Sequence, residues 1–175
     1  MKVSLNWLND YVDIKHITPE TLKDRFTIQS QEVESLSELS TAKNIVVGHT
    51  VSCEPHQDAD KLQVCHVDVG TETLQIICGA PNVKANQKVV VALPGAELPG
   101  DFKIKNTKIR GVESSGMICS LKELGIDEKY HQEAGIHVLP EKTPIGRDAK
   151  DVLGFEDMIM DVDGKPDRPD LLSMF

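Results

Sequence analysis

The segment between residues 44 and 119 alternates short runs rich in β-branched residues with clusters of turn-forming residues. The runs are Ile45–Val51, Leu62–Val69, Leu74–Cys78, Val89–Leu93, and a fifth that covers Lys105–Val112 and resumes at Met117–Cys119. Several short strands with turns at such intervals are typical of small barrels. We therefore predict a five-stranded β barrel, followed by a short helix that starts at Ser120 and a strand over Ile136–Leu139.

The first 39 residues follow a helical pattern instead. Apolar residues recur at helical spacing over residues 5–12, directly after Ser4, which can serve as the N-cap. A second helix is expected after Thr18, because Pro19 suits the first helical position. Residues 32–39 alternate only weakly, in the manner of a short strand.

A polar stretch at residues 37–44, rich in Ser and Thr, marks a boundary between these two patterns. A last strand is expected at residues 158–163, and we predict that it packs on the first segment. The predicted fold class is therefore α+β and mostly β. A barrel domain at residues 40–151 is inserted into a small, discontinuous α/β domain formed by residues 1–39 plus 152–175.

The charge of the chain is unevenly distributed. The net charge is −9, but residues 40–150 hold 13 basic and 14 acidic residues and are nearly neutral. Phosphate binding depends on Lys and Arg side chains that release counterions. Aromatic residues make up only 4% of the chain, so base stacking contributes little and any contact with nucleic acid must rely on Lys and Arg. The basic residues that lie close in sequence are Lys84, Lys88, Lys103, Lys105, Lys108 and Arg110.

The four cysteines, Cys53, Cys65, Cys78 and Cys119, show no CxxC spacing. A zinc site therefore has poor support, and buried, reduced thiols are predicted. The N-terminus has no apolar leader, and no apolar run is long enough to span a bilayer. A cytoplasmic protein without a membrane partner is expected.

Four stretches of the middle segment share the order and spacing of a known family. They are His56–Leu62 with Val67–Gly70, then Ile77–Val83, then Val91–Ala96, then Lys108–Met117 running into Cys119–Gly125. These stretches resemble the tRNA-binding domain found in bacterial phenylalanyl-tRNA synthetase β subunits, in C-terminal appendices of methionyl-tRNA synthetases, and in free-standing tRNA-binding cofactors.

The ends of the chain resemble the β subunit of the bacterial phenylalanyl-tRNA synthetases in particular. The matching stretches are Met1–Leu8 with Tyr11-Val12, Glu32–Glu34 and Arg168–Ser173. The chain departs from this pattern at Asp167, where Asn is usual, at Gly164-Lys165, where Leu or Ile and Thr are usual, and at residues 28–31, which lack a common Gly.

The resemblance implies an OB fold for the barrel and a natural chain that continues beyond Phe175. It places the catalytic motifs on the α subunit, within a heterotetramer of two α and two β subunits. That enzyme uses ATP and Mg²⁺ to attach phenylalanine to tRNA(Phe). For this part we accordingly expect no catalytic residue, no metal, no cofactor and no DNA partner.

We predict that eight residues contact tRNA. Lys61 is expected in the first hairpin turn, and Asn82 and Lys84 in a loop. A row on one face of a single strand is expected from Lys105, Lys108 and Arg110. The remaining two, Ser114 and Met117, match positions that lie near the RNA in the family. Each of the eight could instead be a solvated side chain or a turn former. Gly111 and Gly116 are expected to serve the backbone.

The cluster of His56, Asp58 and Asp60 could suggest a metal site, but these residue types also favour turns, and we prefer the turn interpretation. No nucleophile motif or phosphate-binding loop is present in the sequence.

Two alternatives to tRNA binding stay open at this point. The barrel could mainly pack against neighbouring domains of a synthetase, which the acidic flanks and the scarcity of aromatic residues favour. It could also belong to a free-standing tRNA-binding cofactor that acts as a homodimer, although the resemblance at both ends of the chain counts against this.

Overall fold

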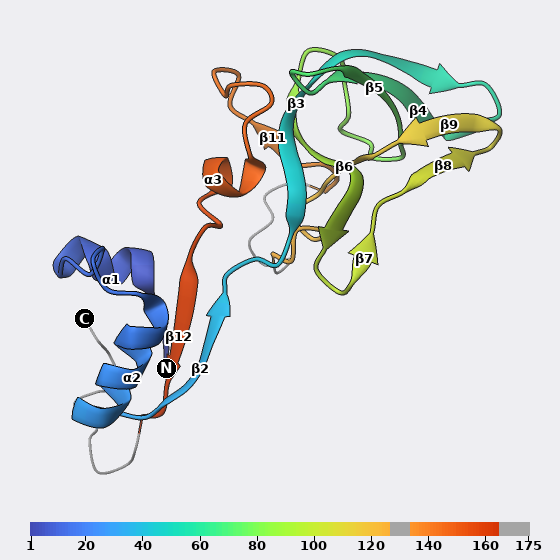
Figure 1. Cartoon of the computed structure of the whole chain (residues 1–175). Helices are drawn as coiled ribbons and strands as arrows, with labels where there is room; N and C mark the ends of the chain where they lie inside the picture. The colour runs from blue at the N-terminus through green and yellow to red at the C-terminus, as the bar shows by residue number, and fades with distance from the viewer. Residues whose placement is uncertain (127–133, 165–175) are drawn as a thin grey trace. The chain divides into compact units, whose positions relative to one another are not determined.

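The computed structural model describes residues 1–126 and 134–164. The chain divides into two compact units, and Figure 1 shows the elements of both. Unit 1 comprises Met1–Leu39 and Phe155–Phe175, and unit 2 comprises Ser40–Gly154. Antiparallel strands dominate unit 2, and unit 1 combines a small antiparallel sheet with two helices, so the chain as described is mostly β. The Arg168–Ser173 stretch lies outside the described residues.

Unit 1 contains a three-stranded antiparallel sheet in the order β1-β12-β2. Its strands are β1 (Lys2–Ser4), β12 (Met158–Val162) and β2 (Val33–Glu38). β12 lies in the middle of the sheet, with Met160 opposite Val3 on one side and Leu36 on the other. The prediction that a strand near residue 160 returns to pack on the first segment is confirmed.

Two helices, α1 (Leu5–Tyr11) and α2 (Pro19–Gln29), complete unit 1. Both begin at the predicted caps, where a hydroxyl oxygen satisfies a backbone N–H that has no partner inside the helix. The Ser4 hydroxyl accepts from the Trp7 N–H at 3.0 Å, and the Thr18 hydroxyl accepts from the Thr21 N–H at 3.3 Å. Phe26 packs from α2 against the buried core of this unit.

Unit 2 is built on a sheet whose strands follow the path β10-β6-β3-β4-β5. The strands of this path are β3 (Lys43–His56), β4 (Ala59–Asp68), β5 (Thr73–Cys78), β6 (Lys88–Leu98) and β10 (Met117–Ile118). Two short strands, β7 (Phe102–Lys103) and β11 (Val138–Leu139), also pair with β6. A separate ladder joins β8 (Asn106–Ile109) to β9 (Val112–Ser115).

Several predicted elements differ from the observed ones. β3 and β6 extend through Pro55 and Pro94, where we had expected turns. Residues 121–125 form turns and not the predicted helix, although the Ser120 N–H and the Glu123 carboxylate make the expected capping contact at 2.6 Å. The helix α3 (Ala149–Leu153), with Asp148 as its N-cap, was not predicted.

The core of unit 2 lies between the strands of this curved sheet. Its buried residues include Cys65 and Val67 from β4, Ile76 from β5, and Val89 and Val91 from β6. β6 is buried on both faces over residues 89–92, and it also pairs with β3 along one edge and with β10 and β11 along the other. Such a strand reads as a continuous apolar run, and this is why Val89–Leu93 was easy to recognise.

The two ends of the strand path are not joined by backbone pairing. Within the described residues, no ladder links β5 to β10 or to β9. The Ser114 hydroxyl of β9 instead accepts a hydrogen bond from the Ile77 N–H of β5 at 3.1 Å. The Gln75 side-chain amide donates to the Glu113 carbonyl at 2.7 Å. The sheet is therefore curved and bridged by side chains, and its ladders do not close a barrel.

Gly48 marks a close approach of three strands. A Cβ atom added there would lie 2.6 Å from Val91 Cγ2 and 2.7 Å from Val67 Cγ1. Both valines are fully buried, and their χ1 angles are stiff. The side chains cannot withdraw without disturbing the core.

We predict that Gly48→Ala lowers the free energy of unfolding by about 1–3 kcal/mol through overpacking. Gly79→Ala is the matched control, because its added Cβ would approach the end of the Leu62 side chain at 3.2 Å and meet the Lys61 carbonyl oxygen only at an ordinary contact distance of 3.9 Å. Urea unfolding of both variants measures the difference. Equal midpoints for the two variants would contradict this view of the core.

We also predict that Ser114→Ala destabilises the chain by about 1–3 kcal/mol, since the Ile77 N–H loses its partner in a buried position. The adjacent, partly exposed Ser115 provides the control substitution Ser115→Ala. Hydrogen exchange at the Ile77 amide should accelerate in the first variant only. Unchanged exchange at that amide would show that Ser114 does not hold β9 to β5.

Candidate nucleic-acid interface

The β8–β9 hairpin carries the densest group of predicted contact residues. Its strands are joined by Arg110 and Gly111, which have φ angles of 51° and 83°. Two consecutive residues with positive φ characterise the type I′ turn, whose twist suits a two-residue hairpin. Arg110 therefore lies at the tip, exposed to solvent.

The predicted row of cations on one strand face is wrong. Lys105 precedes β8, Lys108 lies within β8, and Arg110 belongs to the turn. The sequence run from 105 to 112 was interpreted as one strand, but the Arg110-Gly111 turn reverses the chain inside it. Lys108 is also three residues from Lys105, so the two could not share a face even on a continuous strand.

Glu113 accompanies Lys108 on the hairpin. The two residues lie directly opposite each other, and Lys108 Nζ is 3.3 Å from Glu113 Oε1. Both side chains are largely exposed, at 68% and 73%, so solvent screens the pair and its contribution to stability is small. The pair does, however, place a carboxylate next to a cation that we expected to meet phosphate.

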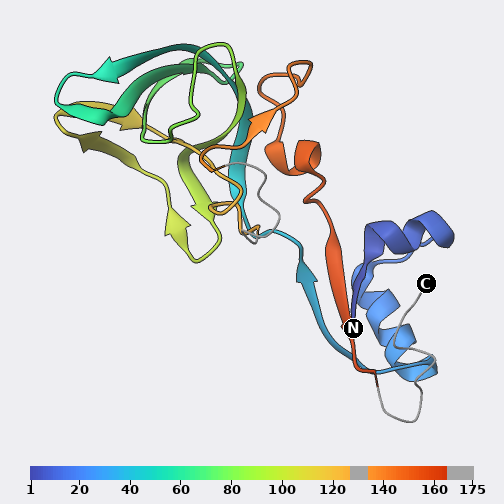
Figure 2. The ribbon, with the colours of Figure 1, turned by 180° about the vertical axis from the view of Figure 1, so that it is seen from behind.

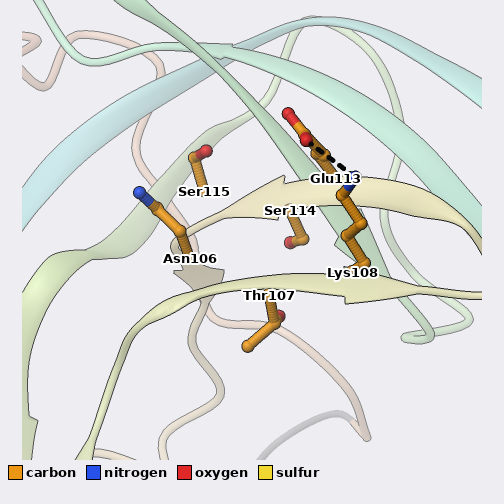
Figure 3. Close-up of a pocket in the computed structure, with 6 residues that line it drawn as sticks. All are labelled: Asn106, Thr107, Lys108, Glu113, Ser114 and Ser115. Carbon is orange, nitrogen blue, oxygen red and sulfur yellow. Dashed lines mark ion pairs between the residues drawn. The ribbon is translucent and has the colours of Figure 1, made fainter.

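A polar pocket lies over this hairpin (Figure 3). Its volume is about 280 Å³, and six residues line it: Asn106, Thr107, Lys108, Glu113, Ser114 and Ser115. Figure 3 shows Asn106, Ser115 and the Lys108–Glu113 pair on one side of the ladder, with Thr107 and Ser114 on the other. The first side offers an amide, a hydroxyl, an ammonium and a carboxylate, groups that can bond phosphate or base edges.

Ser114 and Met117, predicted as contacts, are both held within the fold. Ser114 is only 2% exposed, and its hydroxyl is bonded to the Ile77 N–H and the Gly116 carbonyl. Met117 lies in β10, partly buried, opposite Ala92 of β6. Ser114 therefore has a structural role, because its hydroxyl links the hairpin to β5.

Asn82 and Lys84 lie in the loop between β5 and β6, as predicted. Asn82 is committed to a second segment, because its amide donates to the Ile136 carbonyl and accepts from the Ile136 N–H, both at 2.9 Å. The Lys84 side chain is exposed, while its carbonyl accepts from the Thr50 hydroxyl. Of this pair, Lys84 is the one whose side chain points to solvent.

Lys61 is not in the hairpin turn, where it was predicted, but within β4, three residues after the turn that joins β3 to β4, and it is exposed. Figures 1 and 2 show that this turn and the β8–β9 turn lie at the same end of unit 2. The fold therefore brings Lys61 to the same end as Arg110 and the hairpin that bears Lys108. Acidic side chains accompany them there, from Asp58 and Asp60 as well as from Glu113.

A second group of charges lies at the pairing of β6 with β7 and β3. Glu97 is 2.8 Å from Lys103 and 4.0 Å from Lys43. The hydrogen bond from Lys103, together with the positive charges of both lysines, holds the pKa of Glu97 below its ordinary value. These lysines are therefore partly neutralised by their neighbour.

Three residues that line the pocket were not predicted as site residues: Asn106, Thr107 and Ser115. The available signal was the Arg110-Gly111 pair between two short polar strands, since a glycine at such a position favours a two-residue hairpin. A hairpin centred there would have paired Asn106 with Ser115, as the structure does.

Of the three residues of the His56, Asp58 and Asp60 cluster, only Asp58 lies in the β3–β4 turn, whereas His56 ends β3 and Asp60 lies in β4. His56 is buried, and its Nδ1 accepts from the Asp58 N–H at 3.0 Å. Within residues 1–126 and 134–164, no three His, Cys, Asp or Glu side chains gather in a way that could hold a metal ion.

None of the helices in those ranges has the length and apolar character needed to traverse a bilayer.

Comparison with known proteins identifies relatives over nearly the whole chain. The chain is 51% identical to the phenylalanine–tRNA ligase β subunit of Oceanobacillus iheyensis and 50% identical to those of Geobacillus kaustophilus and Trichormus variabilis. Each match covers 99% of this chain and 22% of the relative. The resemblance to the β subunits of these synthetases is thus confirmed, and the chain spans about 22% of the length of these relatives.

The solved structure of a MetRS related protein from Pyrococcus horikoshii matches 59% of this chain and 85% of its own, with 24% identity and a TM-score of 0.44. A TM-score of this size carries no argument about the fold. A family model described as "Putative tRNA binding domain" matches residues 45–148, which contain the β8–β9 hairpin and its pocket. On this match, the chain belongs to the family of tRNA-binding domains.

Proposed function

We propose that the chain is the N-terminal, tRNA-binding part of a phenylalanine–tRNA ligase β subunit. One end of unit 2 makes the contact, through the β8–β9 hairpin and the β3–β4 turn beside it. The observation that carries this proposal is an exposed polar hairpin with Lys108 and Arg110 inside the family match at residues 45–148. The resemblance of the whole chain to β subunits supports it.

The proposed contact is electrostatically modest. The candidate cations at this end are Lys61, Lys108 and Arg110, and acidic residues lie close to them. Each phosphate neutralised by the protein changes the slope of log K against log salt by about 0.7 to 0.9. A slope between roughly −2 and −3 follows for three contacts. Binding should be weak at physiological salt and should depend little on RNA sequence, because phosphate contacts carry no sequence information.

The fold belongs to the proposal as well. We assign residues 40–151 to a five-stranded barrel of the OB type and residues 1–39 plus 152–175 to a small α/β domain. The hydrogen bonds from β5 to β9 support the barrel, since they bridge the gap between the ends of the strand path. The boundaries between the two compact units, at residues 39/40 and 154/155, support this domain assignment.

The whole enzyme supplies the chemistry in this proposal. ATP and Mg²⁺ act on the α subunit, in an assembly of two α and two β subunits, and the chain described here holds neither the catalytic residues nor the cofactors. Its role is to position tRNA(Phe) for the attachment of phenylalanine. A cytoplasmic location follows from such a partner.

The alternative function is packing against other domains of a synthetase. The ion pair between Lys108 and Glu113 favours it, because that cation is already partly neutralised. Crosslinking of tRNA to the full enzyme separates the two functions. Crosslinks within residues 44–126 support tRNA contact, whereas their absence from that range supports packing.

We predict that the double substitution Lys108→Glu and Arg110→Glu weakens tRNA binding at low salt by roughly tenfold or more, or about 1.4 kcal/mol. The magnitude of the salt slope should also fall by roughly 1.5 for two lost contacts. Fluorescence anisotropy with labelled tRNA at several salt concentrations measures both quantities.

Lys142→Glu is the charge-matched control for the single substitution Arg110→Glu, because each changes the net charge by the same amount. Lys142 is exposed and belongs to the loop before α3, at the opposite end of unit 2 from the β8–β9 turn. The control should bind nearly as tightly as the unmodified chain. Equal losses in both variants would mean that only the net charge matters, and the proposed contact surface would be wrong.

A second prediction follows from the ion pair. Glu113→Gln should strengthen tRNA binding by a few fold, since it removes the carboxylate beside Lys108 while keeping a side chain of similar size. The same anisotropy titration measures the change. Weaker binding in this variant would indicate that Glu113 itself supports the contact, for example by accepting hydrogen bonds from bases.

A further inference from the structure

Two cysteines face each other across the β3–β4 ladder. Cys53 of β3 and Cys65 of β4 occupy directly opposite positions, and their sulfur atoms are 3.1 Å apart. Both are free thiols. Directly opposite residues on antiparallel strands have Cβ atoms about 4.5–5.5 Å apart, and closer at non-hydrogen-bonded positions. Disulfides need a Cβ separation of roughly 3.5–4.5 Å.

The position of Pro55 identifies the kind of pair that Cys53 forms. Pro55 lies opposite Gln63 and has no N–H to donate to β4. A proline within a strand directs its nitrogen away from the ladder, so this pair occupies a non-hydrogen-bonded site. Such sites alternate along an antiparallel ladder. The Cys53–Cys65 pair lies two positions along the ladder from the Pro55–Gln63 pair, in the same regular register. It therefore also occupies a non-hydrogen-bonded site, where opposite side chains approach most closely.

The two thiols differ in their access to solvent. Cys65 is fully buried in the core of unit 2, whereas Cys53 is partly exposed at the edge of that core. The other two cysteines, Cys78 and Cys119, are both buried. In the described ladders Cys78 lies opposite Gln63, not opposite a cysteine. Geometry and access thus distinguish Cys53 and Cys65 from the rest.

We propose that Cys53 and Cys65 form an oxidation site in which a peroxide converts the facing thiols into a cross-strand disulfide. The Cys53 thiolate attacks a peroxide oxygen and breaks the O–O bond, which gives a sulfenic acid and, with hydrogen peroxide, releases hydroxide. The Cys65 thiol then loses its proton and attacks the Cys53 sulfur, and the departing hydroxide leaves as water. The two thiols lose two electrons and two protons, and one hydrogen peroxide becomes two water molecules.

The surroundings of Cys65 slow the second step at neutral pH. Burial, together with the contact to Cys53, raises the pKa of the Cys65 thiol above its ordinary value. The attacking species is the thiolate, and a raised pKa means that its population grows as the pH rises through the alkaline range. Disulfide closure should therefore accelerate from neutral to alkaline pH, while a sulfenic acid on Cys53 persists longer at neutral pH.

The new bond would tie the two strands of the hairpin whose turn precedes Lys61. Crosslinking opposite residues restricts the unfolded chain, provided that the native geometry is kept. Formation of the disulfide should raise the thermal midpoint by at least roughly 5 °C. This inference stands on the pairing of β3 with β4 and does not depend on the proposed function.

The test treats the full 175-residue chain with hydrogen peroxide and then alkylates the remaining thiols after unfolding. Mass spectrometry of the digest should find peptides with Cys53 joined to Cys65, two hydrogen masses lighter than the reduced pair, and alkylated Cys78 and Cys119. Dithiothreitol should reverse the bond. A disulfide between other cysteines, a bond between two chains, or over-oxidised Cys53 beside alkylatable Cys65 would overturn the proposal. A bond that formed without raising the thermal midpoint would overturn its stabilising effect.

Two variants isolate the order of the steps. Cys65→Ala should accumulate a sulfenic acid on Cys53 that dimedone traps, and Cys53→Ala should leave Cys65 alkylatable after the same treatment. Cys53 is partly exposed, so Cys53→Ala perturbs the core less and serves as the folded variant if Cys65→Ala unfolds. Oxidation of Cys65 in the absence of Cys53 would contradict the assignment of Cys53 as the entry point.

Discussion

The hydrogen bond that the Ile77 N–H donates to the Ser114 hydroxyl holds the β8–β9 hairpin against the sheet of unit 2. Backbone ladders do not join β9 to β5, and side-chain bonds take their place across this gap. The candidate contact surface is built on that hairpin, so its orientation depends on a buried serine that does not itself reach solvent. An unsatisfied N–H in this position would be costly, and this cost makes the arrangement specific.

The presence of most strands could be predicted from the sequence, but the way in which they pair could be predicted only in part. The Val89–Leu93 strand is recognisable because a strand buried on both faces is continuously apolar. The two helices of unit 1 are predictable because Ser4 and Thr18 cap them through local hydrogen bonds. The Arg110-Gly111 reversal was missed because residues on both sides of it suit strands equally well. A turn inside such a run is signalled only by the two residues that adopt positive φ.

The residues of the candidate site likewise divide into those that local sequence could place and those that it could not. Local residue preference placed Lys84 in a loop, where the structure shows it exposed, and Lys61 in a turn that ends three residues before it. Ser114 and Asn82 were expected to face RNA, but both are committed to hydrogen bonds with residues more than 35 positions away. Such long-range partners leave no trace in local sequence pattern, and for the same reason the close approach at Gly48 could not be foreseen.

The distribution of charge on unit 2 limits how it can contact tRNA. Unit 2 is nearly neutral, and Lys43, Lys103 and Lys108 each lie beside a carboxylate. Specific placement, and not bulk charge, must therefore direct any contact. Titration of the isotopically labelled chain with tRNA, followed by backbone amide NMR, tests this directly. The account predicts shifts at residues 106–115 and around the β3–β4 turn. Shifts confined to unit 1, or no shifts at low salt, would contradict it.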